Sequence, residues 1–262
     1  MKQLLIYSFI LLLVFLFGCK VEVDDSGESP SGTSATLTID PEADKLLKQM
    51  SDNLISAKEF TVRVESSSDY TNDTGEIVKL HRTNDINLKR PDKIMVETQG
   101  DNGHKQLFYN GSEAVLFHHN YGLYSIVKAP GTVDATLDLL AEVYDLQIPA
   151  SDFAYSNPYA VLMEYVKGGR YYGYSLINGA PCHHLYFIQD EIDWQVWLED
   201  NDQNTPRKYV INFKTIEGSP QFTAYFHDWD FSPSIPDETF NFNPPEGTKQ
   251  IEYLKLGENP SE

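Results

Sequence analysis

The sequence predicts an α+β domain in which helices cover one face of a curled antiparallel sheet of about eleven strands. Three features of the chain support this prediction. From residue 60 onward, most segments alternate apolar and polar residues. Turns rich in Asn, Asp and Gly separate these segments, as at Asn110-Gly111 and Asn178-Gly179. Helical patterns occur only before the strands and as one block among them, which argues against alternating βαβ units.

The first helix is predicted to begin at Pro41, with Asp40 as its N-cap. Apolar residues then recur at helical spacing and define one face: Ala43, Leu46, Leu47, Met50 and Leu54. This pattern fades near residues 56–58, where we expect the helix to end.

The strands follow this helix. The first carries Phe60, Val62 and Val64 on one face. The others are predicted at 76–89, 93–98, 105–109, 113–118, 121–127, 170–177, 182–189, 193–199, 207–214 and 221–228, with a short last strand within 240–245. Because Asn-Gly pairs between apolar runs are typical of hairpins, we expect strands that are adjacent in the sequence to pair antiparallel.

A helical block interrupts the strands. Thr132 is the candidate N-cap of a helix over 133–144, whose apolar stripe is Val133, Leu137, Leu140, Ala141 and Tyr144. A second, short helix is predicted over 158–166. Since a curled sheet has one concave face, these helices are expected to cover it.

The N-terminus has the features of a secretory signal. Lys2 precedes an apolar run over 4–17 that is shorter than the roughly 20 residues needed to span a bilayer. The segment 16–19, Leu-Phe-Gly-Cys, resembles the lipobox of bacterial lipoproteins, although a Phe before the Gly is unusual. This resemblance implies cleavage after Gly18 and lipidation of Cys19, with a diacylglyceryl thioether and an acyl group such as palmitate on the amine. The alternatives are an uncleaved anchor or ordinary cleavage near Gly18.

We therefore expect four parts of the chain: a lipoprotein signal peptide over 1–18, a lipidated flexible tether over 19–38, a single domain over 39–254 and a disordered tail over 255–262. Lys20 follows the cysteine, where an Asp would imply retention at the inner membrane, so we expect an outer-membrane lipoprotein that faces the periplasm. The acidic residues Asp24, Asp25 and Glu28 resemble surface-export signals, which keeps display on the cell surface open.

Composition narrows the classes of function. The net charge of −19 argues against nucleic acids and anionic membrane surfaces as partners, which leaves the lipid anchor as the membrane contact. With Cys19 lipidated, Cys182 has no partner, so we expect no disulfide and a small buried side chain. The chain has no P-loop, nucleotide-binding glycine pattern or serine-hydrolase motif. We expect no catalytic residues, no cofactor, no enzymatic activity and a monomeric protein.

Two other groups of residues are candidates for a site. His118-His119 and His183-His184 are adjacent pairs, and neighbours on a strand point to opposite faces, so we predict no metal site. Trp197 is flanked by acids and is either an exposed contact residue or, as we favour, packed against a neighbouring strand.

Several segments resemble known families. Residues 87–94, 108–111 and 114–117 resemble the lipoprotein-sorting carriers LolA and LolB, with a strand, an Arg-Pro turn, a strand and a hairpin. More specific segments, at 132–138, 193–197, 206–208 and 228–231, resemble an uncharacterised family of predicted periplasmic proteins of the DUF2092 type that shares this fold. The resemblance implies a half-open barrel with a helical lid, and in the carriers the apolar interior shelters acyl chains.

The functional prediction is a non-enzymatic envelope lipoprotein that binds a lipid, or the acyl chains or an apolar segment of an envelope protein, on the concave face. A protein-interaction or sensor module without a small ligand is the alternative, and bulky side chains that fill the interior are the alternative to a cavity. The candidate cavity residues, taken from the alternation and the helical stripe, are Phe60, Val62, Val64, Ile94, Val96, Leu116, Leu137, Leu140, Tyr144, Leu185, Phe187, Trp194 and Val196.

Overall fold

A computed structural model describes residues 37–72, 74–144, 146, 148, 150–253 and 255. The predicted signal peptide, the lipidation site Cys19, the tether up to residue 36 and the tail after residue 255 lie outside these ranges. The described part of the chain belongs to one compact unit that begins at Leu37 and holds the whole core.

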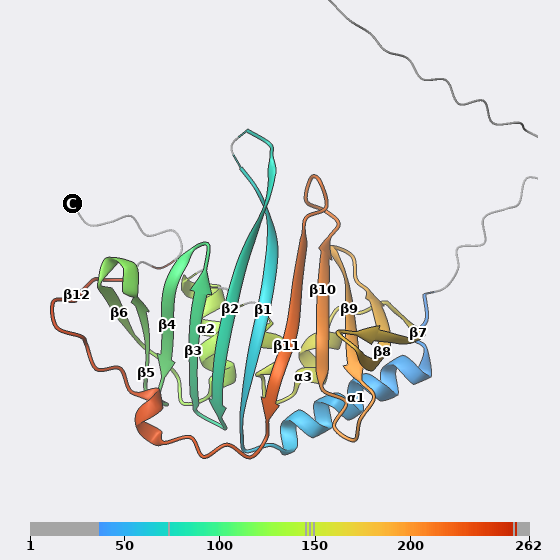
Figure 1. Cartoon of the computed structure of the whole chain (residues 1–262), viewed down its shortest axis with the longest axis horizontal. Helices are drawn as coiled ribbons and strands as arrows, with labels where there is room; N and C mark the ends of the chain where they lie inside the picture. Colours follow the sequence, from blue (N-terminus) through green and yellow to red (C-terminus); the bar gives the residue numbers. More distant parts are fainter. Residues whose placement is uncertain are drawn as a thin grey trace, which may run out of the picture. The chain divides into compact units, whose positions relative to one another are not determined.

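The strands of this unit form a single sheet. They are β1 (Glu59–Thr71), β2 (Ile77–Lys89), β3 (Lys93–Gly100), β4 (Gly103–Tyr109), β5 (Glu113–His118), β6 (Leu123–Lys128), β7 (Gly168–Ile177), β8 (Ala180–Ile188), β9 (Ile192–Glu199), β10 (Pro206–Phe213), β11 (Gln221–Asp230) and β12 (Lys249–Gln250). Their spatial order is β12-β6-β5-β4-β3-β2-β1-β11-β10-β9-β8-β7 (Figure 1).

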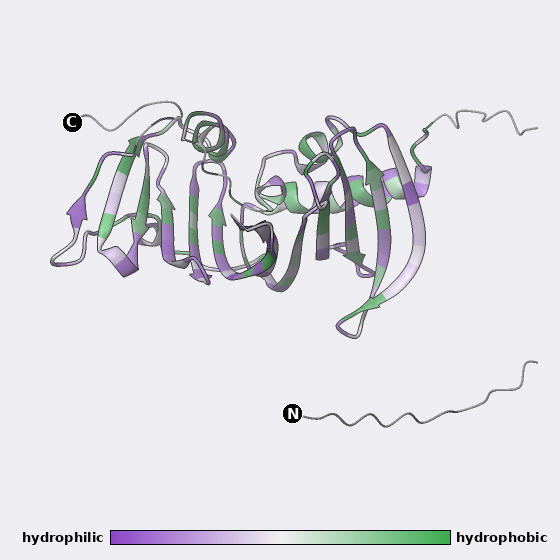
Figure 2. Cartoon of the chain, turned by 90° about the horizontal axis from the view of Figure 1, so that it is seen from above, coloured by the Kyte–Doolittle hydropathy of each residue, from purple (hydrophilic) through white to green (hydrophobic). Residues whose placement is uncertain are grey.

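The sheet is curled and not closed. The strands pair antiparallel with their neighbours, except that the short β12 pairs parallel to β6. Because β12 and β7 form the two edges, the sheet makes a half-open barrel, and helices lie along its concave side (Figure 2). The predicted fold class is therefore confirmed.

Three α-helices lie in the described ranges. They are α1 (Pro41–Ser56), α2 (Val133–Tyr144) and α3 (Pro158–Met163). The Asp40 side chain accepts a hydrogen bond of 2.8 Å from the backbone of Glu42, which confirms the predicted cap of α1. None of the helices in this part of the chain is long and apolar enough to cross a membrane.

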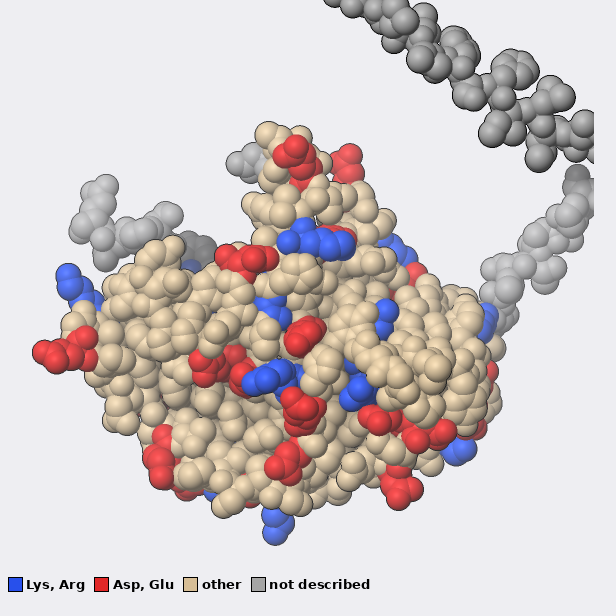
Figure 3. Space-filling model, viewed as in Figure 1, with Lys and Arg blue, Asp and Glu red and all other residues tan. Residues whose placement is uncertain are grey.

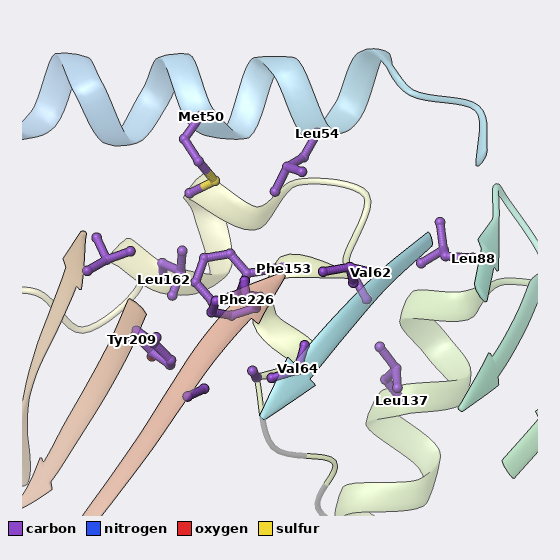
Figure 4. Packing of buried hydrophobic residues seen from close by; sticks show 14 of the residues in the cluster. Met50, Leu54, Val62, Val64, Leu88, Leu137, Phe153, Leu162, Tyr209 and Phe226 are labelled. Carbon is purple, nitrogen blue, oxygen red and sulfur yellow. The ribbon is translucent and has the colours of Figure 1, made fainter. Parts of the chain in front are cut away.

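The core lies between these helices and the concave face. Met50 and Leu54 of α1 point toward Leu162 of α3 and toward the ring of Phe153 (Figure 4). Every member of the predicted apolar face of α1 is at most 4% exposed. The residues that recur at helical spacing in α1 are therefore the ones buried in the core. This tertiary packing stabilises the helix.

The turn between β2 and β3 holds the helical block in place. The carbonyl of Pro91 accepts a hydrogen bond of 2.8 Å from the backbone N–H of Val133, at the start of α2. The guanidinium of Arg90 donates to the carbonyl of Ala154, just before α3, at 2.9 Å. Burial lowers the pKa of Arg90. One tight turn thus contacts the start of α2 and the segment that leads into α3.

The predicted last strand within 240–245 is wrong. Residues Asp237–Phe240 form a turn of 3₁₀ helix, and the final strand is β12, further along. Phe240 is 1% exposed, and the ring of Phe242 packs on Phe108, with centroids 5.5 Å apart. The aromatic alternation in this segment therefore reflects burial of Phe240 and packing of Phe242 on the outer face, and not pairing within the sheet.

The outer face of the sheet is charged along its middle. Figure 3 shows acidic and basic side chains interspersed there, while the flanks carry fewer charges. Arg63 of β1 lies on this face and donates to Asp85 of β2 at 2.7 Å. Such exposed pairs contribute little to stability, about 0–1 kcal/mol. The fold therefore depends on the concave core.

Two neighbouring residues of α1 test this conclusion. Leu54→Ala should lower the free energy of unfolding by about 2–5 kcal/mol, because the side chain is 1% exposed and its removal leaves a cavity. Ile55→Ala is the matched control, since Ile55 is 40% exposed, and it should change stability by about 0.5 kcal/mol or less. Urea unfolding measures both variants. Equal losses would contradict the proposed packing of α1.

A second test concerns the contact between α1 and α3. The Tyr159 hydroxyl donates to Asp44 at 2.5 Å, and this hydrogen bond, with burial second, raises the pKa of Tyr159 to about 12. A tyrosine whose pKa is raised by folding stabilises the folded state at pH values below the pKa that it has in the unfolded chain, about 10. This contribution is lost as the pH rises through the pKa that it has in the folded state.

Tyr159→Phe should therefore be less stable than the wild-type protein near neutral pH, and the gap should shrink between pH 10 and 12. The variant Tyr121→Phe, which removes a hydroxyl from a residue that is 72% exposed, is the control. Chemical unfolding over this pH range measures the difference. A gap that stays constant from pH 8 to 12 would refute the linkage.

Candidate functional site

The register of the strands arranges the inner face of the sheet in rows. One row is apolar from β1 to β6 and consists of Phe60, Leu88, Ile94, Tyr109, Ala114 and Val127. The next row, Val62, Ile86, Val96, Leu107 and Leu116, is also apolar and ends at Ser125. Because side chains on one face of a strand recur every second residue, each row is a consequence of the alternation.

Two further rows are polar. The row that begins at Val64 continues with Asn84, Thr98, Lys105 and His118. The row after it contains Ser66, Arg82, Gly100 and Gly103. The concave face therefore changes from apolar to polar along the length of the strands.

α2 and the residues that follow it cover the apolar rows and the polar rows differently. Leu137 and Leu140 of α2 pack in the core with the apolar rows. Leu146 and Ile148, which follow α2, line two hollows on the same side of the sheet. The packed core thus gives way to open space near the polar rows.

The larger hollow, which we call the cleft, has a volume of about 580 Å³. Its walls come from β1, β2, α2, six described residues between 146 and 155, and the hairpin of β10 and β11. They consist of Ser68, Asp69, Arg82, Leu137, Ala141, Leu146, Ile148, Ala150, Ser151, Asp152, Tyr155, Ile211, Phe213, Ile216, Pro220, Gln221 and Phe222. Most of these side chains are apolar, and the volume falls within the roughly 300–1,000 Å³ that is typical of ligand sites.

The smaller hollow, which we call the basic hollow, has a volume of about 120 Å³. It is lined by Arg82, Asn84, Val96, Thr98, Asn102, Gly103, Lys105, Leu107, Leu116, Leu146 and Ile148. Arg82, Leu146 and Ile148 are also walls of the cleft. The two hollows are therefore neighbours that share one partition.

The polar groups of the basic hollow differ in their partners. The Thr98 hydroxyl donates to Asn84 at 2.8 Å, and the Asn84 amide donates to the carbonyl of Val64 at 3.3 Å. Burial, followed by the nearby charge of Lys105, lowers the pKa of His118. Lys105 and His118 are neighbours across β4 and β5, and the inner face beside them therefore disfavours a further positive charge.

One carboxyl group of the cleft is electrostatically perturbed. Burial raises the pKa of Asp152, and burial together with the charge of Asp152 raises the pKa of Tyr209. The Tyr155 hydroxyl donates to Asp138 of α2 at 2.8 Å, and its pKa is raised mainly by burial. This wall of the cleft therefore favours neutral groups.

The structure brings most of the predicted cavity residues together, but in the packed core. Phe60, Val62, Val64, Ile94, Val96, Leu137, Leu140, Leu185, Phe187, Trp194 and Val196 are at most 4% exposed within one cluster, and Tyr144 packs against it. Of the thirteen, Val96, Leu116 and Leu137 also line the cleft or the basic hollow. Contact of these residues with a ligand stays a prediction.

Sequence reasoning missed the residues that surround the open space. Arg82 and Lys105 could have been found by extending the alternation of the predicted strands toward their polar ends. Leu146 and Ile148 follow a helix without a period of their own, so no sequence signal placed them on the concave side. Ile211 and Phe222 also line the cleft. They lie in strands that the sequence predicts, at positions that fit the apolar alternation, but they are not among the predicted cavity residues.

The histidine pairs separate as expected. His118 lies in the inner polar row, whereas His119 stacks on His104 with ring centroids 3.7 Å apart. His183 is bonded to Tyr171 at 2.9 Å, and His184 stacks on Trp197 at 4.1 Å. Among the residues that the structure describes, no group of three His, Cys, Asp or Glu side chains could hold a metal ion.

Two further predictions concern buried side chains. Trp197 is 8% exposed, so the packed interpretation is confirmed. Cys182 is fully buried, and burial raises the pKa of its thiol to about 11. A thiol with a pKa this high is a poor nucleophile at neutral pH, which agrees with a core role.

Comparison with known proteins places the chain in a family. No curated protein is similar to the sequence at a significant level. Among solved structures, an uncharacterised conserved protein from Thermus thermophilus is 8% identical, with a TM-score of 0.48 over 80% of this chain and 99% of that one.

Two other solved structures are similar to a comparable extent. The lipoprotein LppX of Mycobacterium tuberculosis is 13% identical, with a TM-score of 0.48 over 75% of this chain and 100% of that one. A LolA superfamily protein from Nitrosomonas europaea is 10% identical, with a TM-score of 0.40 over 76% and 97%. The family described as "Predicted periplasmic protein (DUF2092)" matches residues 43–254, which confirms the resemblance noted in the sequence, and the chain belongs to this family.

Proposed function

We propose that this protein is a non-enzymatic lipoprotein of the cell envelope that binds a hydrophobic ligand, a lipid or the acyl chain of an envelope protein, on its concave face. The observation that carries the proposal is the cleft of about 580 Å³ between α2, the segment 146–155 and the hairpin of β10 and β11. This cleft is lined mostly by apolar side chains, and its wall residues Leu137 and Phe222 belong to the buried hydrophobic core.

The energetics favour an acyl chain in this cleft. Burial of apolar surface stabilises a complex by about 25 cal/mol per Å², or about 0.8 kcal/mol for each methylene group. The walls Leu137, Ile211 and Phe222 supply such surface from a helix and two strands. Because the neighbouring core is packed, these walls are held in place and the ligand need not displace core side chains.

The lipid anchor gives the proposal its setting. Lipidation of Cys19 would fix the protein to a membrane, and two or more acyl chains make such an anchor stable. A protein held in this way does not carry cargo freely through the periplasm. Its binding would be that of a membrane-fixed acceptor, reversible and without a chemical step.

A second candidate function is an interaction or sensor module. It is favoured by β7, an edge strand of the sheet that is bridged to Ile39 only near its start, at Gly169, among the described residues, and that exposes Tyr172, Tyr174 and Leu176 by 63%, 65% and 71%. An edge strand offers unpaired backbone groups to another chain. The bulge between Tyr171 and Tyr174 disturbs this edge, so we rank this candidate second.

The binding proposal is tested by filling the cleft. Ala141 of α2 is one of its walls, and Ala141→Trp should weaken binding of a fluorescent fatty acid to residues 36–262 by about tenfold or more, because the indole occupies the site of the chain. Fluorescence titration measures the dissociation constants.

Ala160→Trp provides the matched control, since Ala160 is an exposed residue of α3 that lines neither hollow. It should bind as the wild-type protein does. If the wild-type protein binds no fatty acid, and lipid analysis of the purified protein finds none, the proposal is refuted. Recovery of one stoichiometric envelope protein in a pull-down that β7 variants abolish would favour the second candidate.

The anchor requires its own test. Cys19→Ala should release the protein from the membrane fraction, because the variant lacks the thiol that forms the thioether. Fractionation of cells followed by immunoblotting measures the distribution. Retention of the variant at the wild-type level would show that Cys19 does not hold the protein at the membrane.

A further inference from the structure

Two basic side chains on the concave face lack the partners that others in this protein have. On β2, Lys79 pairs with Asp69 at 2.5 Å, and Asp85 pairs with Arg63 at 2.7 Å. Arg82 lies between them on the same strand, yet its side chain forms no ion pair or hydrogen bond with any residue that the structure describes.

Lys105 of β4 is in the same situation. Within the described residues its side chain has no ion pair and no hydrogen bond, although the chain carries a net charge of −19. Both side chains are half-buried, and both line the basic hollow. Among the described residues that line this hollow, the ordinarily charged side chains are these two cations, and no carboxylate is among them.

The backbone keeps this hollow open. Gly103, one of its walls, has φ of +90°, and a Cβ there would lie 2.7 Å from the Asn120 side chain. A Cβ at Gly100, which is paired with Arg82, would lie 2.1 Å from the carbonyl of His81. Glycine is therefore required at both positions. Because neither residue has a side chain, the polar end of the inner face carries few bulky groups.

The acids of the adjoining cleft do not compete for these cations. Asp69 accepts hydrogen bonds from Lys79 and from the backbone N–H of Gln221. Asp152 is on the wall formed by the segment after α2, and its charged form is disfavoured by burial. An anion is thus disfavoured in the cleft and favoured in the basic hollow, next to the shared partition of Leu146 and Ile148.

We propose that Arg82 and Lys105 form the head-group pocket for an amphiphile with an acyl chain and an anionic head group, a carboxylate or a phosphate. The inference rests on the proposed function, because the acyl chain lies in the cleft while the head group lies in the basic hollow. An anion in the basic hollow lies among walls that include both cations, and charge-assisted hydrogen bonds to half-buried groups are stronger than those to exposed ones.

The test compares ligands that differ only in the head group. Tetradecanoate, tetradecyl phosphate and tetradecanol have the same chain length, and each is titrated into residues 36–262, the fragment that contains the whole core, by competition with a fluorescent fatty acid at pH 8. At least one of the two anions should bind about tenfold or more tightly than the alcohol, and this preference should fall as salt is added. Whichever anion binds more tightly identifies the head group.

The variants Arg82→Gln and Lys105→Gln should each reduce this preference, and the double variant should abolish it by lowering the affinity for the anions to that for tetradecanol. Lys128→Gln is the matched control, because Lys128 is an exposed cation of β6 that lines neither hollow. It should keep the wild-type preference.

The outcomes separate the two proposals. If none of the three ligands binds, the proposed function fails. If the alcohol binds as tightly as both anions, or if the double variant keeps the preference for an anion, the cleft binds acyl chains but the head-group pocket is refuted. Circular dichroism and unfolding curves of the variants confirm that a lost preference does not reflect a lost fold.

Discussion

The antiparallel register of β1 to β5 is the constraint on which the rest of the structure depends. It places Phe60, Leu88, Ile94 and Tyr109 side by side in one row, and the helices pack on this row and the next. A shift of one residue between two strands would move an entire apolar set to the outer face. The core and the open space therefore follow from the same pairing, since the rows beyond that of Val62, which begin at Val64 and Ser66, are polar and border the open space.

The helical lid depends on these rows as well. α1 and α3 are joined through Tyr159, whose hydroxyl reaches Asp44 and whose backbone N–H donates to Ser51 at 3.0 Å. The turn at Arg90 and Pro91 holds the start of α2 and the segment before α3. With the lid held at these points, the segment around Leu146 and Ile148 crosses the boundary between apolar and polar rows, and this crossing divides the open space into the cleft and the basic hollow.

Much of the fold is accessible from the sequence, and for identifiable reasons. The predicted start of α1 is correct because Asp40 and Pro41 give a strong local signal, and α2 is correct over its full length because its stripe keeps one period. The prediction for the end of the chain is wrong, since the rings of Phe240 and Phe242 alternate as in a strand but pack across distant residues. Local periodicity cannot distinguish these two cases when the partners are far away in the sequence.

The candidate site is harder to predict, because a cavity is defined by what the side chains leave unfilled. Apolar alternation identifies residues that face inward, such as Trp194 and Val196, and these fill the core. The informative residues are the polar ones at the far ends of the same strands. A cation that faces inward, as Arg82 does, and has no side-chain partner among the described residues is costly to desolvate. Two such groups lie beside an apolar cleft in this structure, and this pairing of charge with apolar volume is what supports the proposed anionic amphiphile over an imperfectly packed core.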